Sequence, residues 1–283
     1  MDTKTLLTAV AVCDALGAPF EEVPRRRRPD HLPERSFLAE DGTRPLVAIL
    51  GGTALYGTFT DDTQIALAAV DALRRAPSDP LPAYRENLVA WGRGAFTVQG
   101  RRLDVGIQTS RAIRALARGR TPRPTDSSGN ACLLVASAVY AERGDDWALI
   151  ERFVRTTHNS DEAVSSSAEF LRLVAWIEGG KKGREPLTLG GERIDSIDSI
   201  DIGAVPPSGY SVHTAIRALG AFTSGLPMAD AVRRICLAGG DTDSIAAAYA
   251  VLATAEGLTP GAELVRTMLG RDVIASVLDP ADA

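Results

Sequence analysis

The amino-acid sequence predicts an all-α protein, and three observations support this fold class. Alanine-rich apolar runs recur along the 283 residues, and their apolar positions return with helical spacing. Only 5% of the residues are aromatic while alanine is abundant, which favours close-packed helices over a β-sandwich. Segments rich in glycine and proline separate the runs. Because every helical run has a similar composition, we expect one domain over residues 1–283.

The apolar runs and their breakers define the expected elements in order. A first helix is expected over Leu6–Leu16, and Gly17 and Pro19 end it. Gly17–Phe59 is rich in proline, glycine and arginine, and is expected to hold little regular structure. The motifs GGKKG, EPLTLGG and VPPSG predict a second irregular segment over residues 179–210. The other helices are expected at about 61–75, 82–94, 106–118, 128–143, 145–157, 160–178, 211–223, 228–237, 242–256 and 261–269.

Composition and charge argue against several classes of protein. The net charge of -5 comes with no sustained basic signal, so nucleic acid is not expected as a partner. Cys13, Cys132 and Cys236 are odd in number and widely spaced, which argues against a disulfide framework and favours a reduced, cytoplasmic setting. Asp14 interrupts the apolar run near the N-terminus, which argues against a signal peptide. No stretch approaches a membrane span of about 20 apolar residues. We expect a monomer or weak homo-oligomer without a membrane partner.

Two short acidic motifs each open an alanine-rich run, and they lie far apart in the chain. The first is GTFTDDTQIALAAV and the second is AGGDTDSIAAAYAV. Together they carry four carboxylates and at least two hydroxyl groups, which are hard oxygen ligands. Such a set suits Mg²⁺, Mn²⁺ or Ca²⁺ better than Zn²⁺ or copper. If the fold brings the motifs together, they form a metal site.

The alternative interpretation is that the two motifs only cap helices. Thr60 or Asp61 would accept hydrogen bonds from the first turn of its helix, which stabilises a helix by about 1 kcal/mol. The second motif is harder to explain as a cap. Asp241 and Ser244 lie three residues apart and therefore on one face of a first turn, and Asp243 points from an adjacent direction. A cap needs one such residue, and this motif has three.

Helix N-termini carry partial positive charge, which disfavours a bound cation. Four converging carboxylates would supply more negative charge than two helix dipoles oppose. Without a cation the same carboxylates would repel one another, and some would take up protons.

Two further charged segments have simpler explanations. The tandem repeat IDSIDSIDI spans Ile194–Ile202 with a period of three, which matches neither a strand nor a helix turn. It could form a cation-binding loop, but a solvated connector with capping Ser and Asp residues is the favoured interpretation. The run Arg25–Arg28 could meet phosphates, but four adjacent charges cannot all converge on one ligand, which favours a solvated loop.

Seven segments, in order, resemble the conserved blocks of the ADP-ribosylglycohydrolases, a family that includes the ADP-ribosylarginine hydrolases and the dinitrogenase-reductase-activating glycohydrolase. The segment CDALGAPFE is similar to the G-D-x-x-G-x-x-x-E opening of that family, and GTFTDDTQIALA to its T-D-D-T block. LDVGIQTSRAI resembles the D-x-G-x-x-T stretch, and TTHNSDEAV the T-H-x-x-x-x-A segment. SSGNACLLVASA resembles the glycine–asparagine loop, and SGYSVHTAIRAL and AGGDTDSIAAAYA resemble the closing blocks. The resemblance covers nearly the whole chain.

The resemblance implies an orthogonal all-α bundle with two Mg²⁺ or Mn²⁺ ions in a cleft. It implies the metal ligands Thr60, Asp61, Asp62, Asp241, Asp243 and Ser244. Two carboxyl groups match catalytic positions. Glu21 matches a glutamate that contacts or covers the metal site, and Asp104 matches the proposed acid/base near the scissile bond.

The resemblance also implies four residues that hold the substrate. Gly129 and Asn130 match a loop that cradles the diphosphate, and His158 matches a histidine that contacts ADP-ribose. Tyr210 lies in a loop that resembles the one near the adenosine.

Each of these matched residues also has a purely structural explanation. Glu21 could be a surface residue of a polar loop, and Asp104 could cap the helix that follows it. Gly129 and Asn130 are an ordinary pair at a helix start, and His158 could be a helix-end histidine, where a cation is favourable.

Three positions depart from the family pattern. Cys13 replaces the usual glycine, so the backbone there could approach its neighbours less closely. Ala131 and Cys132 replace a common methionine–arginine pair, which could alter recognition of phosphate or sugar. Ser244 replaces threonine, which keeps the hydroxyl ligand but removes the methyl group that restricts its rotamer.

The implied reaction is hydrolysis of an N- or O-glycosidic bond between ADP-ribose and a protein side chain such as arginine or serine. The anomeric carbon would pass through an oxocarbenium-like state while metal ions orient the ribose and Asp104 moves the proton. One alternative is hydrolysis of a smaller ribosyl N-glycoside from nucleotide or secondary metabolism. Another is a catalytically weak relative that binds ADP-ribose.

Overall fold

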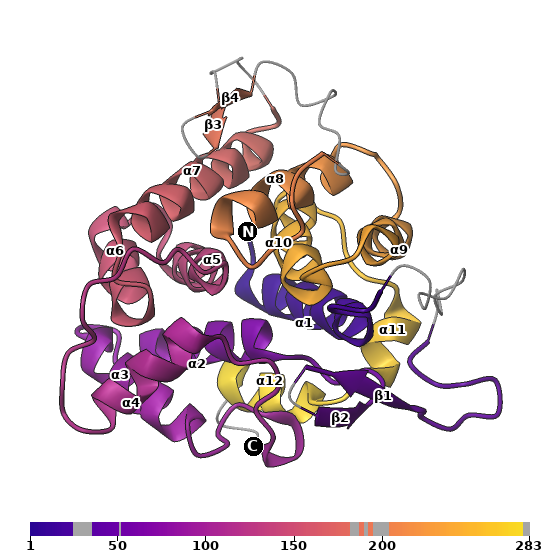
Figure 1. Ribbon diagram of the computed structural model, residues 1–283, viewed down its shortest axis with the longest axis horizontal. Coiled ribbons are helices and arrows are strands. Elements are labelled where there is room, and N and C mark those ends of the chain that lie inside the picture. The colour runs from indigo at the N-terminus through magenta and orange to yellow at the C-terminus, as the bar shows by residue number, and fades with distance from the viewer. Residues whose placement is uncertain (25–35, 51, 182–186, 190–191, 195–203, 280–283) are drawn as a thin grey trace.

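Helices account for nearly all the regular structure of the chain (Figure 1). The computed structural model describes residues 1–24, 36–50, 52–181, 187–189, 192–194 and 204–279. The helices in this part are α1 (Thr3–Gly17), α2 (Asp61–Arg75), α3 (Pro80–Trp91), α4 (Ile107–Leu116), α5 (Ala131–Arg143), α6 (Trp147–Thr157), α7 (Asp161–Glu178), α8 (Ser211–Phe222), α9 (Met228–Ala238), α10 (Thr242–Ala255), α11 (Ala262–Thr267) and α12 (Arg271–Leu278). The all-α prediction is confirmed.

Helices α1 and α10, from opposite ends of the chain, pack together more extensively than any other pair (Figure 1). Every residue of α10 from Thr242 to Thr254 is buried, as expected for a helix that is apolar on all faces. The contact is closest at Gly17, where an added Cβ would lie 2.5 Å from the carbonyl oxygen of Thr242 and 2.6 Å from the Cα of Asp243. The end of α1 therefore lies directly against the start of α10.

One hydrophobic cluster extends through the helices. It contains Leu6 near the N-terminus, Ile65 of α2, Val135 of α5 and Leu278 of α12. The core of the described residues therefore draws on both ends of the chain. Among the described helices, none is both long and apolar enough to cross a membrane.

The expectation of little regular structure over Gly17–Phe59 is wrong in part. A 3₁₀ turn, η1 (Ala18–Phe20), follows α1 directly. Strands β1 (Leu46–Ile49) and β2 (Gly52–Leu55) then form an antiparallel hairpin. These strands are four residues long, which is too short for an alternating pattern to stand out in the sequence.

The hairpin helps to position the loop that precedes α4. Ala18, Ile49, Ala54 and Leu103 form a second, small hydrophobic cluster. The backbone N–H of Asp104, the residue after Leu103, donates a hydrogen bond to the carbonyl oxygen of Leu50 over 3.1 Å. The hairpin therefore ties the Asp104 loop to the end of α1.

Several other features differ from the sequence prediction. Helix α5 begins at Ala131 instead of residue 128, because Gly129 pairs with Tyr210 in an isolated antiparallel bridge. The expected helix over 261–269 stops at Thr267, and α12 follows Gly270, whose φ of 76° interrupts the helical path. A second hairpin, β3 (Leu187–Leu189) with β4 (Glu192–Ile194), lies in the segment expected to be irregular. The run Arg25–Arg28 and most of the repeat Ile194–Ile202 lie outside the described residues.

We predict that Gly17→Ala lowers the free energy of unfolding by about 3 kcal/mol, because its methyl group would overlap backbone atoms of α10. Urea titration of the purified variant measures this loss. Gly261→Ala is the control, since an added Cβ there meets nothing within 4 Å. That control should lose no more than about 1 kcal/mol as a helix N-cap substitution. Equal losses in the two variants would contradict the close α1–α10 contact.

Candidate active site

The two acidic motifs meet where α2 and α10 begin. The hydroxyl group of Ser244 donates a hydrogen bond to Oδ2 of Asp62 over 2.5 Å. The hydroxyl of Thr60 lies 3.2 Å from Oδ2 of Asp243. Of the six predicted metal ligands, all are buried except Asp241, which is half-buried. The fold therefore joins two segments that the chain separates by about 180 residues.

The motifs do not act as caps of their own helices. Thr60 is the N-cap of α2 and Asp241 is the N-cap of α10, yet neither side chain accepts a capping hydrogen bond from its helix. The Thr60 hydroxyl contacts Asp243 of the other motif, and the Asp241 carboxylate accepts a hydrogen bond from Asn130. The helix-cap interpretation therefore does not account for these residues.

Asp14 of α1 provides the cap for α2. Its carboxylate accepts hydrogen bonds from the backbone N–H of Thr60 over 2.9 Å and of Thr63 over 3.2 Å. It also accepts from the Thr60 hydroxyl over 2.8 Å and from the Thr63 hydroxyl over 2.5 Å. Burial raises the pKa of Asp14 to about 6, and the hydrogen bonds from Thr63 and Thr60 oppose that rise.

Asp14 was not among the site residues predicted from the sequence. It is fully buried in a helix whose neighbouring residues are almost all apolar. Two signals were available: a lone carboxylate in such a run needs partners from elsewhere in the fold, and Asp14 matches the aspartate of the G-D-x-x-G-x-x-x-E block. The partners, Thr60 and Thr63, lie more than 40 residues away.

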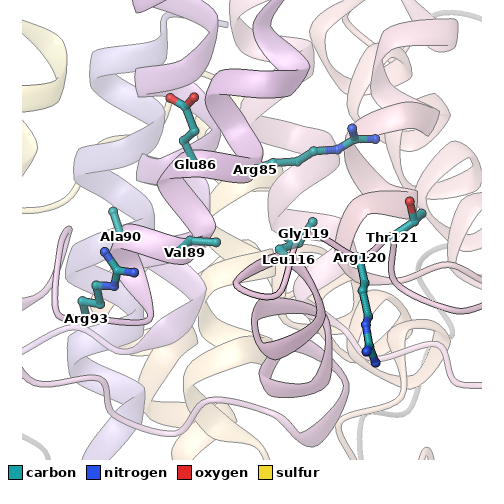
Figure 2. Close-up of a pocket in the computed structure, with 9 residues that line it drawn as sticks. All are labelled: Arg85, Glu86, Val89, Ala90, Arg93, Leu116, Gly119, Arg120 and Thr121. Carbon is teal, nitrogen blue, oxygen red and sulfur yellow. The ribbon is translucent and has the colours of Figure 1, made fainter.

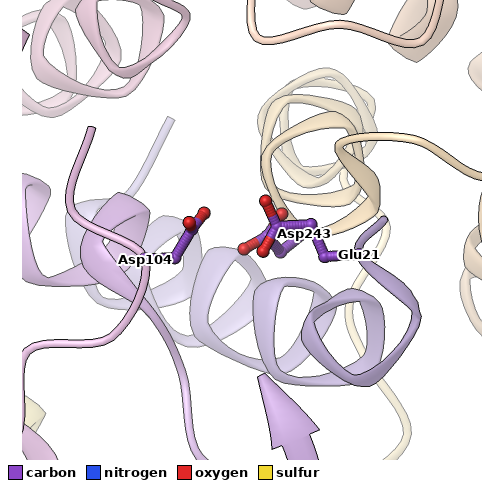
Figure 3. Close-up of side chains that lie close together, drawn as sticks. All are labelled: Glu21, Asp104 and Asp243. Carbon is purple, nitrogen blue, oxygen red and sulfur yellow. The ribbon is translucent and has the colours of Figure 1, made fainter. Parts of the chain in front are cut away.

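Three carboxyl groups from different parts of the chain converge in Figure 3. Single oxygens of Glu21, Asp104 and Asp243 all lie within 4.8 Å of one another. Asp104 faces the other two from the opposite side of the group (Figure 3). Glu21 is held near α10 because the N–H of the next residue, Glu22, donates to the carbonyl oxygen of Gly240 over 3.1 Å.

Asp104 occupies an unusual backbone conformation. Its φ is 58°, in the left-handed region that aspartate tolerates better than most residues. It does not cap α4, whose N-cap is Gly106 and has no side-chain cap. The alternative of a simple helix cap is therefore wrong for Asp104.

It is energetically unfavourable for all the carboxyl groups of the cluster to be ionised at the same time. Burial, followed by the charges of neighbouring carboxylates, raises the pKa values of Asp61, Asp62 and Asp243 well above their ordinary range. Burial also raises the pKa of Glu21 to about 10, and the nearby charge of Asp104 adds to that rise. Burial raises the pKa of Asp104 to about 7, although its contact with Glu21 opposes the rise.

The donor set fits a divalent cation. Two buried oxygens, Oε2 of Glu21 and Oδ1 of Asp241, find no hydrogen-bond partner among the described residues. Buried polar atoms normally have a partner, so these two require an explanation. Hard carboxylate and hydroxyl oxygens without nitrogen or sulfur ligands suit Mg²⁺ or Mn²⁺, and a cation would satisfy both oxygens and offset the clustered charge.

Asn130 links this cluster to the predicted substrate side. Its side-chain amide donates to Oδ2 of Asp241 over 3.0 Å and to the hydroxyl of Thr214 over 3.1 Å. It is the N-cap of α5, but its side chain makes no capping hydrogen bond. Its backbone N–H donates to the carbonyl oxygen of Gly209 over 3.0 Å. An ordinary helix-start role therefore does not describe this asparagine.

His158 lies against Gly129 at the end of α6. A Cβ added at Gly129 would lie 3.1 Å from Nε2 of His158, so a larger residue would press on the ring. Burial lowers the pKa of His158 to about 4, which makes the imidazole neutral at physiological pH. His158 does end α6, as the structural interpretation expects, but burial disfavours the cationic form that a helix end would favour.

Tyr210 is the most peripheral of the predicted site residues. It is half-buried, and its hydroxyl group donates to the carboxylate of Glu162 on α7. Its ring meets the ring of His213 edge-on, with 4.9 Å between the centroids. The bridge between Tyr210 and Gly129 connects this residue to the loop of Asn130.

Comparison with known proteins decides the family. The model of the ADP-ribosylglycohydrolase family matches residues 3–258. The chain belongs to the ADP-ribosylglycohydrolase family. It is therefore a glycohydrolase enzyme. It is 27% identical over 275 residues to the ADP-ribosylarginine hydrolase Tri1 of Pseudomonas putida (strain GB-1), with 89% of this chain and 69% of that protein covered.

The fold agrees with that of a solved relative. An ADP-ribosylglycohydrolase-related protein complex matches with a TM-score of 0.69 and 24% sequence identity. The match covers 97% of this chain and 94% of that chain.

The three departures from the ADP-ribosylglycohydrolase pattern have different surroundings. Cys13 is fully buried, and burial raises the pKa of its thiol. Cys132 is also buried, with its sulfur 3.9 Å from the hydroxyl of Ser166, and burial raises its pKa to about 11. Ser244 keeps its hydroxyl group directed at Asp62. The two thiols are therefore core groups, and the serine remains part of the cluster.

We predict that His158 makes this glycohydrolase sensitive to acid. The unfolded chain protonates a histidine below about pH 6.5, while folded His158 resists protonation until about pH 4. Its stabilising contribution is complete above pH 6.5 and is lost as the pH falls toward 4. Between pH 7.5 and pH 5 the wild type should lose about 2 kcal/mol of unfolding free energy more than His158→Gln does.

Urea titrations at the two pH values measure the difference, with His213→Gln as the control for the change of residue type. An equal loss in the wild type and in His158→Gln would show that the imidazole is solvated.

Proposed function

We propose that this glycohydrolase depends on a divalent metal and cleaves the bond between ADP-ribose and an arginine side chain of a protein. The observation that carries the proposal is the convergence of the two acidic motifs, with buried oxygens of Glu21 and Asp241 left without partners. Arginine is the proposed acceptor because the curated relative is named as an ADP-ribosylarginine hydrolase.

Two Mg²⁺ or Mn²⁺ ions are the proposed cofactors. The residues that would hold them are Thr60, Asp61, Asp62, Asp241, Asp243 and Ser244. When bound, the ions would supply Lewis acidity to the ribose hydroxyls and to the hydrolytic water. The clustered carboxylates supply the negative charge that outweighs the positive ends of α2 and α10.

The remaining residues would bind the substrate and move a proton. Asn130 stands beside Asp241 and would orient the diphosphate end of ADP-ribose relative to the cations. His158 is neutral and buried, so it would contact the sugar without adding charge. Asp104 faces Glu21 across the cluster and would give a proton to the leaving guanidinium nitrogen or take one from water. Tyr210 would contact the adenosine.

Release of ADP-ribose tests the activity directly. Purified protein with Mg²⁺ would be incubated with ADP-ribosyl-arginine, ADP-ribosyl-serine and a simple ribosyl N-glycoside. We expect release from the arginine substrate and inhibition by free ADP-ribose. Turnover of the simple glycoside alone, without inhibition by ADP-ribose, would favour a smaller ribosyl substrate. Binding of ADP-ribose with no turnover of any substrate would identify a catalytically weak relative.

We predict that Asp61→Asn and Asp241→Asn each lower kcat by at least about 100-fold, because a cation site that stabilises the transition state contributes several kcal/mol. The helical circular dichroism signal should remain, since neither side chain caps its helix. Asp145→Asn is a matched control in the exposed turn between α5 and α6 and should retain activity. Near-wild-type turnover in Asp241→Asn would remove this residue from the proposed site.

We predict that Mg²⁺ raises the melting temperature of protein stripped with a chelator. A ligand at 100 times its Kd stabilises the folded state by about 2.7 kcal/mol, which corresponds to a rise of roughly 5 °C or more at this chain length. The rise should be larger at pH 8 than at pH 6, because the raised pKa values of the carboxyl groups make protons compete with the cation. Calorimetry of the wild type and Asp241→Asn measures both effects. An unchanged melting temperature at both pH values would argue against a tight metal site.

A further inference from the structure

Among the described residues, one short part of this acidic protein is rich in arginine. Residues 101–123 contain seven arginines and one aspartate, with no lysine or glutamate, while the whole chain has a net charge of -5. Arg101 and Arg102 precede α4, and the other five arginines are spaced along α4 and the segment after it, where they form no continuous basic run. These five arginines come together on the surface because the segment after α4 folds back beside that helix.

These arginines surround a cavity of about 710 Å³ beside α4. The cavity, called here the arginine pocket, is lined by Arg111, Arg114, Arg118, Arg120 and Arg123 together with uncharged residues and one acid, Asp126. All five arginines are exposed. Within the described part of the chain, no carboxylate forms an ion pair with any of them. Their charge is therefore available to an outside ligand.

A second hollow extends the same basic surface. Figure 2 shows this cavity of about 490 Å³ between α3 and the end of α4. Arg120 and Thr121 line both cavities, and Arg85 and Arg93 of the α3 side add two more guanidinium groups. Glu86 is the one acid among its lining residues. The arginine pocket thus lies at the centre of a broader positive surface.

The arginine pocket borders the candidate active site on two sides. Thr157 lines the pocket, and its hydroxyl group lies 2.9 Å from Nδ1 of His158, which faces Gly129. Gln108, another lining residue, follows Asp104 by four residues at the start of α4. Thr125 joins the two sides, because its hydroxyl contacts the Gln108 side chain over 3.3 Å and its N–H donates to the carbonyl oxygen of Asn159 over 3.0 Å.

We propose that the arginine pocket binds an acidic segment of the acceptor protein next to its ADP-ribosylated side chain. This inference rests on the proposed function and adds the class of protein substrate to it. The protein carries a net charge of -5, which repels an acidic segment in general, so a positive pocket next to the active site would offset that repulsion as the acceptor approaches. Guanidinium groups bind carboxylates through paired hydrogen bonds, which gives recognition as well as attraction.

The lining of the pocket favours a peptide over nucleic acid. No aromatic side chain lines the arginine pocket, whereas sites for single-stranded nucleic acid stack bases on aromatic rings. The arginines of this surface line two adjoining cavities of a protein whose net charge is negative. An extended polyanion would run from these cavities onto repulsive surface, and a short acidic segment would not.

Binding of unmodified peptides tests the pocket without relying on catalysis. The probes are a fluorescent ten-residue peptide with four glutamates around one arginine, the same peptide with glutamines, and a single-stranded oligonucleotide. Fluorescence anisotropy would be measured with the wild type and with Arg118→Glu/Arg123→Glu. The control is Arg172→Glu/Arg271→Glu, which makes the same change of charge at exposed positions outside the pocket.

We expect the wild type and the control to bind the glutamate peptide at least about ten times more tightly than the glutamine peptide at low salt, with the difference shrinking at high salt. The pocket variant should lose this preference. Equal affinity for both peptides, or an unchanged preference in the pocket variant, would overturn the proposal. So would tighter binding of the oligonucleotide in competition with the glutamate peptide, which would make the surface a nucleic-acid site.

Kinetics with the same peptides, ADP-ribosylated on the arginine, connect the pocket to the reaction. The glutamate-flanked substrate should have a KM at least about tenfold lower than the glutamine-flanked one, and the pocket variant should reduce that ratio toward one. A ratio near one in the wild type would overturn the proposal. If no substrate is hydrolysed by the wild type, the proposed function fails, while the anisotropy result still decides whether the pocket binds acidic peptides.

Discussion

The rest of the site depends on the buried carboxylate of Asp14. It accepts hydrogen bonds from the backbone and the side chains of both Thr60 and Thr63, so it fixes the start of α2 against the last turn of α1. Because Asp14 accepts from the N–H groups of Thr60 and Thr63 at the start of α2, the side chains of Asp61 and Asp62 are not needed to cap that helix. The carboxylate of Asp14 on α1 therefore leaves the carboxylates of Asp61 and Asp62 on α2 available for ligand binding.

The close contact of α1 with α10 completes the arrangement from the other side. Gly17 brings the two backbones together, and Asp243 follows directly in the first turn of α10. The hairpin of β1 and β2 and the Leu103 contact then bring the Asp104 loop to the same place. Four separate segments thus deliver carboxyl groups to one buried volume, which raises their pKa values in the absence of a counterion. Burying several carboxylates together without a cation is unfavourable in free energy. A bound metal ion would remove this unfavourable term, and this is the physical argument for a metal site.

The sequence predicted the all-α fold and most helices correctly, because long apolar runs with helical spacing depend mainly on local pattern. Its errors lie where the pattern is short or where distant segments meet. The four-residue strands β1 and β2 were too brief to detect. The start of α5 was placed three residues early because the pairing of Gly129 with Tyr210 joins parts of the chain about 80 residues apart. Asp14 was overlooked as a site residue because its hydrogen-bond partners are also distant.

The sequence by itself determined the composition of the site: two acidic motifs with oxygen ligands only, further matched residues at Glu21, Asp104, Asn130 and His158, and their order along the chain. Only the tertiary structure decided that Ser244 meets Asp62 and that Thr60 meets Asp243, and that His158 is neutral. It also decided that scattered arginines on α4 and its loop surround one cavity. Residue types and periodicity are local properties of a chain, whereas burial, pKa shifts and the gathering of like charges arise from contacts between distant segments.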